Sequence, residues 1–181
     1  GYGRRTKGFR FVSVGDSSAD SGDEPLQFKK KFPGLTVAVC EKRVVGIERL
    51  QEEHDLVILD DAYQHRAVDA GLKLLLFDYT RLNEPLVVLP AGNLREPFSG
   101  RARADAIILT KTEADLSDWE REKAIKRVKP LAGQQVLFSY LKYGRLIPLF
   151  DGEAVELADL RLDTKVYLLT GIANPKPLHR K

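Results

Sequence analysis

The sequence predicts an α/β fold: a mainly parallel sheet flanked by helices, with a small antiparallel β appendage toward the C-terminus. Short aliphatic runs without charge recur along the chain, as in strands that are covered on both faces. Segments between several of these runs carry apolar residues at helical spacing. Beyond residue 132 the apolar runs are separated by turns at Tyr143-Gly144 and Asp151-Gly152, which indicates an antiparallel hairpin.

The first half of the chain is expected to contain two strands and two helices. Pro25 suits the first turn of a short helix, with Asp23 or Glu24 near its cap. Apolar residues between 44 and 50 repeat at helical spacing and predict an amphipathic helix. The expected elements are a strand at 9–14, a helix at 25–32, a strand at 35–40 and a helix at 41–54.

The second half should supply further buried strands and one clear helix. Leu116, Trp119, Val128 and Leu131 are expected on the apolar side of that helix, with Trp119 in the core. The expected elements are strands at 56–59, 72–78 and 105–112, a helix at 116–131, a hairpin at 134–157 and a strand at 165–175. We assign 1–132 to an α/β core and 133–181 to the start of a smaller C-terminal domain plus a returning strand.

Composition narrows the class of protein. The 181 residues are 43% hydrophobic and 30% charged, which excludes a mostly disordered chain. A net charge of +3 is too weak to indicate nucleic-acid binding. The single cysteine, Cys40, excludes an internal disulfide, and its place in an apolar run predicts a buried, inert thiol. No apolar segment approaches the ~20 residues of a spanning helix, and no signal peptide is evident.

Two adjacent carboxylates, Asp60 and Asp61, follow the aliphatic run Leu56–Leu59. Open α/β sheets hold ligands at the carboxyl ends of their strands. Two like charges side by side are unfavourable unless a cation or hydrogen-bond donors neutralise them. The pair therefore indicates a cation site, while the alternative is that Asp60 caps a turn and Asp61 faces solvent.

The same layout is typical of P-loop NTPases, in which a strand-end Asp holds Mg²⁺ through water. The phosphate-binding motif G-x-x-x-x-G-K-S/T does not occur in the sequence. We expect it upstream of Gly1, in a longer protein of which this chain, without methionine, is a piece cut at both ends. Thr110–Thr112 is similar to the N/T-K-x-D base-reading motif of GTPases, although Glu113 stands where that motif has Asp.

Several ordered motifs resemble those of the tetraacyldisaccharide 4'-kinases, the lipid A 4'-kinases of Gram-negative bacteria. They are "GYGRR", "GDEP" (22–25), "DDAYQHR" (60–66) and "LPAGNLREP" (89–97), supported by "RADAIILTKT" and "TGIANP". The resemblance implies a P-loop kinase that transfers the γ-phosphate of ATP, with Mg²⁺, to the 4'-hydroxyl of a tetraacylated glucosamine disaccharide 1-phosphate. It also implies a peripheral location on the cytoplasmic face of the inner membrane.

The resemblance also implies roles for individual residues. Asp23 looks like the catalytic base for the sugar hydroxyl, and Asp60 and Asp61 look like the metal-binding acids. Ala62 departs from the expected "DDG" and should strain the loop if that glycine needs a positive φ. Gln64 and His65 would face the ATP phosphates or the waters of the metal. The implied substrate-binding residues are Arg43, Asn93, Arg95 and Glu96.

Simpler roles remain open for several of these residues. In the simpler alternatives, Asp23 only caps a helix and Arg43 only forms a surface salt bridge with Glu41 or Glu48. Arg95 and Glu96 would pair with each other and fix their loop. The basic stretches at 1–10 and 29–31 would be solvated surface, or else contact an anionic ligand or membrane. His54 is expected at the surface and His179 in the tail.

Three functions from different classes follow. The first is the lipid kinase, of which this fragment alone should be inactive, with the acylated disaccharide and the membrane surface as partners and no nucleic acid. The second is a GTPase-like switch or metal-chaperone NTPase. The third is a noncatalytic α/β binding module, which would show no metal-dependent nucleotide binding.

Overall fold

The structure, a computed structural model, describes residues 3–148, 150–160, 165 and 167. The chain divides into two compact units, Gly1–Tyr140 and Leu141–Lys181. The assignment of 1–132 and 133–181 to functional domains stays a prediction.

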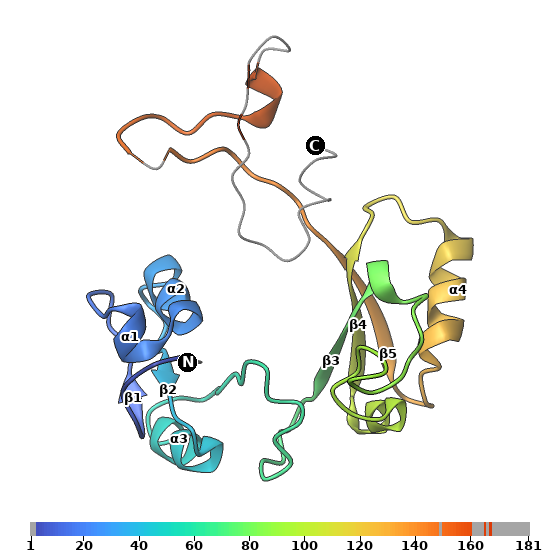
Figure 1. The fold of residues 1–181 in the computed structure, drawn as a ribbon, viewed down its shortest axis with the longest axis horizontal. Coiled ribbons are helices and arrows are strands. Elements are labelled where there is room, and N and C mark those ends of the chain that lie inside the picture. Colours follow the sequence, from blue (N-terminus) through green and yellow to red (C-terminus); the bar gives the residue numbers. More distant parts are fainter. Residues whose placement is uncertain (1–2, 149, 161–164, 166, 168–181) are drawn as a thin grey trace. The chain divides into compact units, whose positions relative to one another are not determined.

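The larger unit contains a three-stranded parallel sheet in the order β3-β4-β5 (Figure 1). The strands are β3 (Leu74–Asp78), β4 (Ala106–Thr112) and β5 (Gln135–Tyr140). The α/β class and the strands predicted at 72–78 and 105–112 are confirmed. Residues 135–140, expected in the antiparallel hairpin, instead pair in parallel with β4, because α4 (Asp118–Val128) provides the crossover that a parallel pair needs.

One face of this sheet holds the main core. Ile107 and Leu109 of β4 are fully buried against Ala124 and Val128 of α4. The helix begins where Ser117 and Glu120 form a capping box. It ends at Lys129, which has a left-handed φ of 49° and comes directly before Pro130.

The prediction that Trp119 lies in the core is wrong. Its side chain is 68% exposed, and Lys123 lies over its ring at 5.1 Å. Trp119 precedes Val128 by nine residues, which at about 100° per residue places the two side chains on roughly opposite sides of the helix. Leu131, expected on the same apolar side, is 46% exposed, whereas Leu116 is buried.

The N-terminal segment forms a second, smaller arrangement. Strands β1 (Arg10–Phe11) and β2 (Ala38–Val39) pair antiparallel, so the strands expected at 9–14 and 35–40 are short and lie outside the parallel sheet. Val12, Val39 and Leu26 form its core. Its helices are α1 (Ser18–Ser21), α2 (Asp23–Lys31) and α3 (Arg43–Leu50). The last two confirm predicted helices, while α1 was expected to be loop.

The aliphatic run Leu56–Leu59, predicted as a buried strand, is not a strand in the structure. Leu56 is 74% and Ile58 is 83% exposed. No strand among the described residues pairs with this run. A strand depends on a hydrogen-bonding neighbour and on covered faces, and this segment has neither within the part of the chain that the structure describes.

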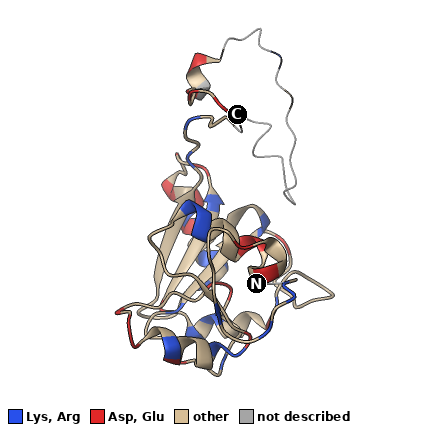
Figure 2. Cartoon of the chain, turned by 90° about the vertical axis from the view of Figure 1, so that its left-hand side faces the viewer, with Lys and Arg blue, Asp and Glu red and all other residues tan. Residues whose placement is uncertain are grey.

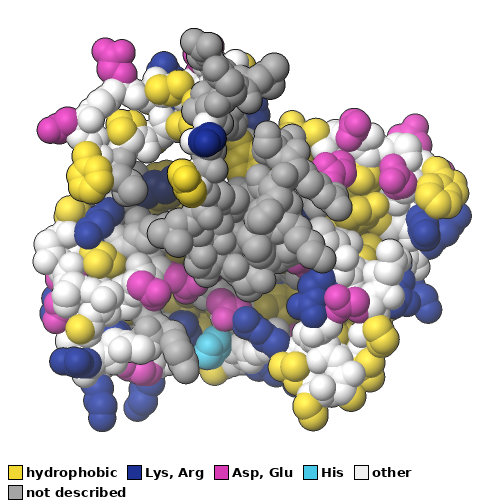
Figure 3. Space-filling model, turned by 45° about the horizontal axis from the view of Figure 1, so that its top comes forward, with side chains coloured by type: hydrophobic (Ala, Val, Ile, Leu, Met, Phe, Trp, Pro, Cys, Tyr) yellow, Lys and Arg dark blue, Asp and Glu magenta, His cyan; other side chains and the backbone are white. Residues whose placement is uncertain are grey.

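Other large hydrophobic side chains of the described surface are also exposed (Figure 3).

Three short 3₁₀ helices complete the described elements: η1 (Tyr79–Arg81), η2 (Phe98–Arg103) and η3 (Leu157–Asp159). In the smaller unit, Leu146 and Val155 form an isolated antiparallel bridge across the predicted turn at Asp151-Gly152. The strand expected at 165–175 and His179 lie almost wholly outside the described residues. No described helix is both long enough and apolar enough to cross a membrane.

Candidate active site

The carboxylate pair lies on a loop that Tyr63 anchors to the sheet. Asp60 and Asp61 are both exposed in a turn, whereas the Tyr63 ring packs against the main core cluster. The Tyr63 hydroxyl donates to the carbonyl of Gly100 at 2.9 Å. Burial raises the pKa of Tyr63, which keeps the hydroxyl a donor. The pair is therefore presented to solvent from an anchored loop.

The backbone strain expected at Ala62 falls on Asp61 instead. Asp61 has a φ of 47° and is one of three residues other than glycine with positive φ in the described chain. Aspartate tolerates this left-handed region better than most residues, because its short polar side chain bonds locally. Ala62 thus follows the turn without adopting a positive φ.

Arg95 and Glu96 do not pair with each other. The Arg95 guanidinium contacts Asp61 at 2.5 Å, and this hydrogen bond and charge raise the pKa of Arg95. Glu96 accepts two hydrogen bonds of 2.9 Å from Nη2 of Arg103. Arg103 also lies over the Tyr63 ring at 4.7 Å and donates to the Tyr63 carbonyl at 3.3 Å. The "LREP" loop and the "DDAYQHR" loop are therefore tied together twice.

Gly100 lies in the middle of this anchor, where a larger residue would displace the Glu96 carboxylate. A Cβ atom there would lie 2.7 Å from Cδ of Glu96, far inside van der Waals contact. In this structure Glu96 fixes the loop, which was one of its two open roles. Contact of Arg95 or Glu96 with substrate stays a prediction.

Asn93 lies in a tight turn of the same loop. Its amide donates to the carboxylate of Glu84, which also accepts from Arg81. At the neighbouring Gly92, a Cβ atom would lie 2.3 Å from the Val87 carbonyl oxygen, so only glycine permits this turn.

The Gln64 and His65 side chains are exposed and make no hydrogen bond with another described residue.

Asp23 is the first residue of α2, directly after the N-cap Gly22, which has a φ of 90°. Its carboxylate is exposed and, among the residues that the structure describes, accepts only from the neighbouring backbone N–H of Glu24, at 3.0 Å. With Arg5 and Ser18 it lines an open hollow of about 360 Å³. No described hydrogen bond or ion pair links Asp23 to Asp60, so its role as a base stays a prediction.

Arg43, the first residue of α3, donates to the carbonyl of Cys40. No ion pair with Glu41 or Glu48 is formed among the described residues, and Glu41 pairs with the buried Arg4 at 2.5 Å. Cys40 itself is half-buried, and a Cβ atom added at Gly46 would lie 3.2 Å from the Cys40 Cβ.

The carboxyl edge of the sheet carries a charged pair that the sequence reading missed. Asp78 ends β3, and Lys111 near the end of β4 contacts it at 2.7 Å. Burial acts to raise the pKa of Asp78, but hydrogen bonds from Lys111 and Thr80 lower it below its ordinary value. Lys111 has a φ of 58°, where the β4–β5 register shifts. The signal was available, since "LFD" ends a strand with an acid as "ILDD" was expected to do.

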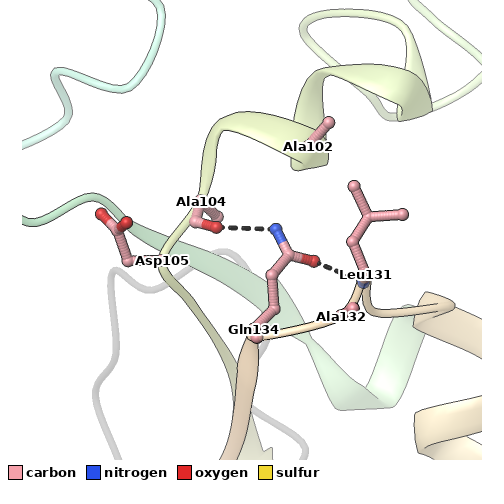
Figure 4. Close-up of a pocket in the computed structure, with 7 residues that line it drawn as sticks. Ala102, Ala104, Asp105, Leu131, Ala132 and Gln134 are labelled. Atoms are coloured by element: carbon pink, nitrogen blue, oxygen red, sulfur yellow. Dashed lines mark hydrogen bonds between the residues drawn. The ribbon is translucent and has the colours of Figure 1, made fainter.

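A second hollow, of about 310 Å³, lies at the opposite, amino-terminal edge of the sheet (Figure 4). Gln134 bridges it by donating to the carbonyls of Ala104 and Arg101 and accepting from the N–H of Leu131. Every polar atom of its side chain amide serves this bridge. Gln134 therefore closes a loop and is not poised to bind a ligand.

The chemistry of Asp60 and Asp61 fits Mg²⁺. No three His, Cys, Asp or Glu residues come together as a metal-binding group in the described chain. Mg²⁺ needs no such cage, since it is usually held by one or two carboxylates with waters and substrate phosphates. Two exposed, adjacent carboxylates provide the hard oxygen ligands for that mode of binding.

A family model described as tetraacyldisaccharide-1-P 4'-kinase (LpxK) matches residues 1–181. Proteins named tetraacyldisaccharide 4'-kinase are similar in sequence to nearly the whole of this chain. That of Phocaeicola vulgatus is 42% identical over 184 residues, covering 98% of this chain and 50% of the relative. That of Flavobacterium johnsoniae is 39% identical over 180 residues, covering 98% and 52%.

A solved structure is also similar, described as the "apo" form of LpxK from Aquifex aeolicus in complex with ATP. It has a TM-score of 0.60 and 32% identity, over 76% of this chain and 41% of that one. This chain spans about half the length of the curated relatives it matches. The family model, however, matches it from end to end, and this chain belongs to the LpxK family, the tetraacyldisaccharide-1-P 4'-kinases.

Proposed function

We propose that this chain is part of a lipid A 4'-kinase that transfers the γ-phosphate of ATP to the 4'-hydroxyl of a tetraacylated glucosamine disaccharide 1-phosphate. The observation that carries this proposal is the family match over residues 1–181. The site supports it, because one anchored surface presents the two carboxylates beside Arg95. Phosphoryl transfer depends mainly on positioning and charge neutralisation, which is what such a set of charges supplies.

In this proposal Asp60 and Asp61 hold Mg²⁺, which neutralises charge on the ATP phosphates when bound. Arg95 already neutralises Asp61 and restrains its carboxylate. The side chains of Gln64 and His65, which make no hydrogen bond with another described residue, orient phosphate oxygens or metal-bound water. Asp23 accepts the proton of the sugar hydroxyl, for which an exposed carboxylate with no ion-pair partner among the described residues is suited.

We further propose that Arg43, Asn93, Arg95 and Glu96 line the binding surface of the disaccharide. Because the acceptor carries acyl chains, the enzyme works at a lipid surface, on the cytoplasmic face of the inner membrane. The support for this location is the chemistry of the acceptor, which does not leave the bilayer readily.

The test uses a chimera in which this chain replaces the matching segment of the Phocaeicola vulgatus kinase. With Mg²⁺, labelled γ-phosphate from ATP should appear on the tetraacyldisaccharide 1-phosphate, with GTP a poorer donor. The matched variant Asp60→Ala should lower turnover by a factor of about 10² or more, in line with the loss of a major transition-state contact. A folded chimera without transfer, beside an active parent, would refute the proposal, and a preference for GTP would favour the GTPase-like alternative.

A further inference from the structure

Arg103 contacts both loops of the candidate site but lies in neither of them. It is the last residue of η2, seven residues after Glu96. Lysines and arginines lie on many helices and loops of the described chain (Figure 2 shows them in blue), so a positive charge alone does not mark a functional residue. Arg103 is distinguished instead by the partners of its guanidinium.

Those partners come from two different loops. Nη2 of Arg103 donates to both carboxylate oxygens of Glu96 at 2.9 Å. It also donates to the carbonyl of Tyr63 at 3.3 Å, and the guanidinium carbon lies 4.7 Å from the centroid of the Tyr63 ring. The side chains of Arg103 and Glu96 are only 29% and 19% exposed. A charge-assisted contact that is sheltered in this way holds its geometry better than an exposed ion pair.

The sheltered contacts lie next to the charged residues of the site. Tyr63 follows Asp61 by two residues, and Glu96 comes directly after Arg95. Consecutive Cα atoms are about 3.8 Å apart, so a displacement of either partner reaches the charged residues through at most two peptide units. The contact between Asp61 and Arg95 is itself exposed, with 66% and 61% of the side chains accessible, and such a pair stabilises little. The spacing of the loops is therefore set by Arg103 and not by the exposed pair.

The loop that carries Arg95 is also fixed on its other side. Asn93 donates to the carboxylate of Glu84. Arg127 of α4 donates to the carbonyls of Leu82 and Glu84 at 2.9 and 2.8 Å. Arg95 lies between these two fixed points, so its backbone is restrained even though its side chain is exposed.

We infer that Arg103 is a positioning residue of the phosphoryl-transfer site, because it fixes the spacing of the two loops on which Asp61 and Arg95 lie. This inference rests on the proposed function and adds to it a residue that acts through others. Groups that orient metal-binding residues commonly change metal affinity or activity by about 10- to 100-fold when they are removed. A misplacement of about 1 Å is enough for a loss of that size in a transfer reaction.

The experiment uses the chimera described above and measures Mn²⁺ binding by electron paramagnetic resonance in the presence of ADP. Mn²⁺ takes the same oxygen ligands as Mg²⁺, and ADP has no γ-phosphate to transfer, so this readout is independent of activity. Arg103→Gln should weaken Mn²⁺ binding by a factor of about 10 or more. In the transfer assay it should lower kcat by about 10- to 100-fold and change the KM for ATP much less, because nucleotide contacts outside the two loops are retained.

Two further variants act on the same contact. Arg103→Lys keeps the positive charge but loses the planar group that reaches the carboxylate and lies over the ring, so it should recover only part of the loss. Gly100→Ala keeps Arg103 but displaces the Glu96 carboxylate from it, so Mn²⁺ affinity should fall in the same direction. These two variants decide the matter if Arg103→Gln does not fold.

The matched control is Arg121→Gln on α4. Arg121 also lies over an aromatic ring, 5.0 Å from the centroid of Phe138, and donates to the carbonyl of Leu116 at 3.1 Å. Its replacement should lower stability but leave Mn²⁺ binding and kcat as in the parent chimera. Circular dichroism under the assay conditions checks that each variant is folded.

Unchanged Mn²⁺ affinity and kcat in the folded Arg103 variants would overturn the inference. Equal losses in Arg121→Gln would overturn it as well, and so would a parent chimera that binds no Mn²⁺. A parent that binds Mn²⁺ with ADP but transfers no phosphate would refute the proposed function, whereas a weaker Mn²⁺ affinity in Arg103→Gln would still support the positioning role.

Discussion

The anchor that joins the two site loops should behave as one energetic unit. Arg103→Gln removes two hydrogen bonds to Glu96, one to the Tyr63 carbonyl and the cation–π contact with the Tyr63 ring. The Arg103 and Glu96 side chains are only 29% and 19% exposed, so water replaces the lost partner poorly. We expect the free energy of unfolding to fall by about 2 kcal/mol, the usual loss for a partly buried charge-assisted contact.

Gly100→Ala should act on the same contact from the other side. The new Cβ would lie 2.7 Å from Cδ and 2.9 Å from Oε2 of Glu96, so the carboxylate must turn away from Arg103. We expect a loss of about 1–2 kcal/mol from this substitution. The double variant should be little worse than Arg103→Gln alone, because both changes break one contact and their effects do not add.

Urea unfolding of the 181-residue chain, followed by circular dichroism, measures these free energies. Gly71→Ala is the control, since an added Cβ there meets no atom within 4 Å and the φ is not positive. It should change stability by no more than about 0.5 kcal/mol. Additive losses in the double variant, or a Gly100→Ala loss no larger than that of the control, would show that the two loops are not joined in this way.

Three further predictions follow from individual residues. Lys111→Gly and Lys111→Ala both remove the contact with Asp78, but at this positive φ only alanine is strained. In urea unfolding the glycine variant should be more stable than the alanine variant by about 1 kcal/mol, and equal stability would refute the strain. The pKa of Asp78 is lowered in the folded chain, so its contribution to stability is present above its ordinary value of 3.8 and is lost as pH falls through the folded value. Asp78→Asn should therefore flatten the stability–pH profile below about pH 4, and an unchanged profile would assign the acid sensitivity elsewhere. Asp23→Ala in the chimera should lower kcat by roughly 10²–10⁴-fold with an unchanged KM for ATP if Asp23 is the base, whereas a small loss of stability with normal kcat would make it only a helix-terminal residue.

The sequence predicted the elements whose signals are local. The helix that became α4 was predicted from apolar residues at helical spacing, and the structure adds the local capping box at Ser117 that begins it. Strand β4 was predicted from the uncharged apolar run at its start, Ala106–Leu109. Trp119 was misplaced because a tryptophan was taken as a core residue by its size, while the apolar side of the helix is in fact made by small residues such as Ala124.

Contacts between distant residues could not be predicted in the same way. The anchor brings Tyr63 to Gly100 and Arg103, 37 and 40 residues further along the chain. No local periodicity encodes such a pairing. The glycine in "FSGRARAD" was a usable signal, since a glycine in a short helical turn is unfavourable unless a neighbour needs the space of its missing Cβ.

The run Leu56–Leu59 shows most clearly how a correct physical pattern can still give the wrong local structure. Uninterrupted aliphatic residues indicate a strand covered on both faces, but that state depends on neighbours that supply hydrogen bonds and cover. Among the described residues none does, and Leu56 and Ile58 are left largely exposed. The carboxylates that follow are nevertheless held, because Tyr63 ties their loop to the core and Arg95 contacts Asp61. The position of the carboxylate pair therefore rests on the residues after it, not on the run before it, and this is why the site persists where the strand does not.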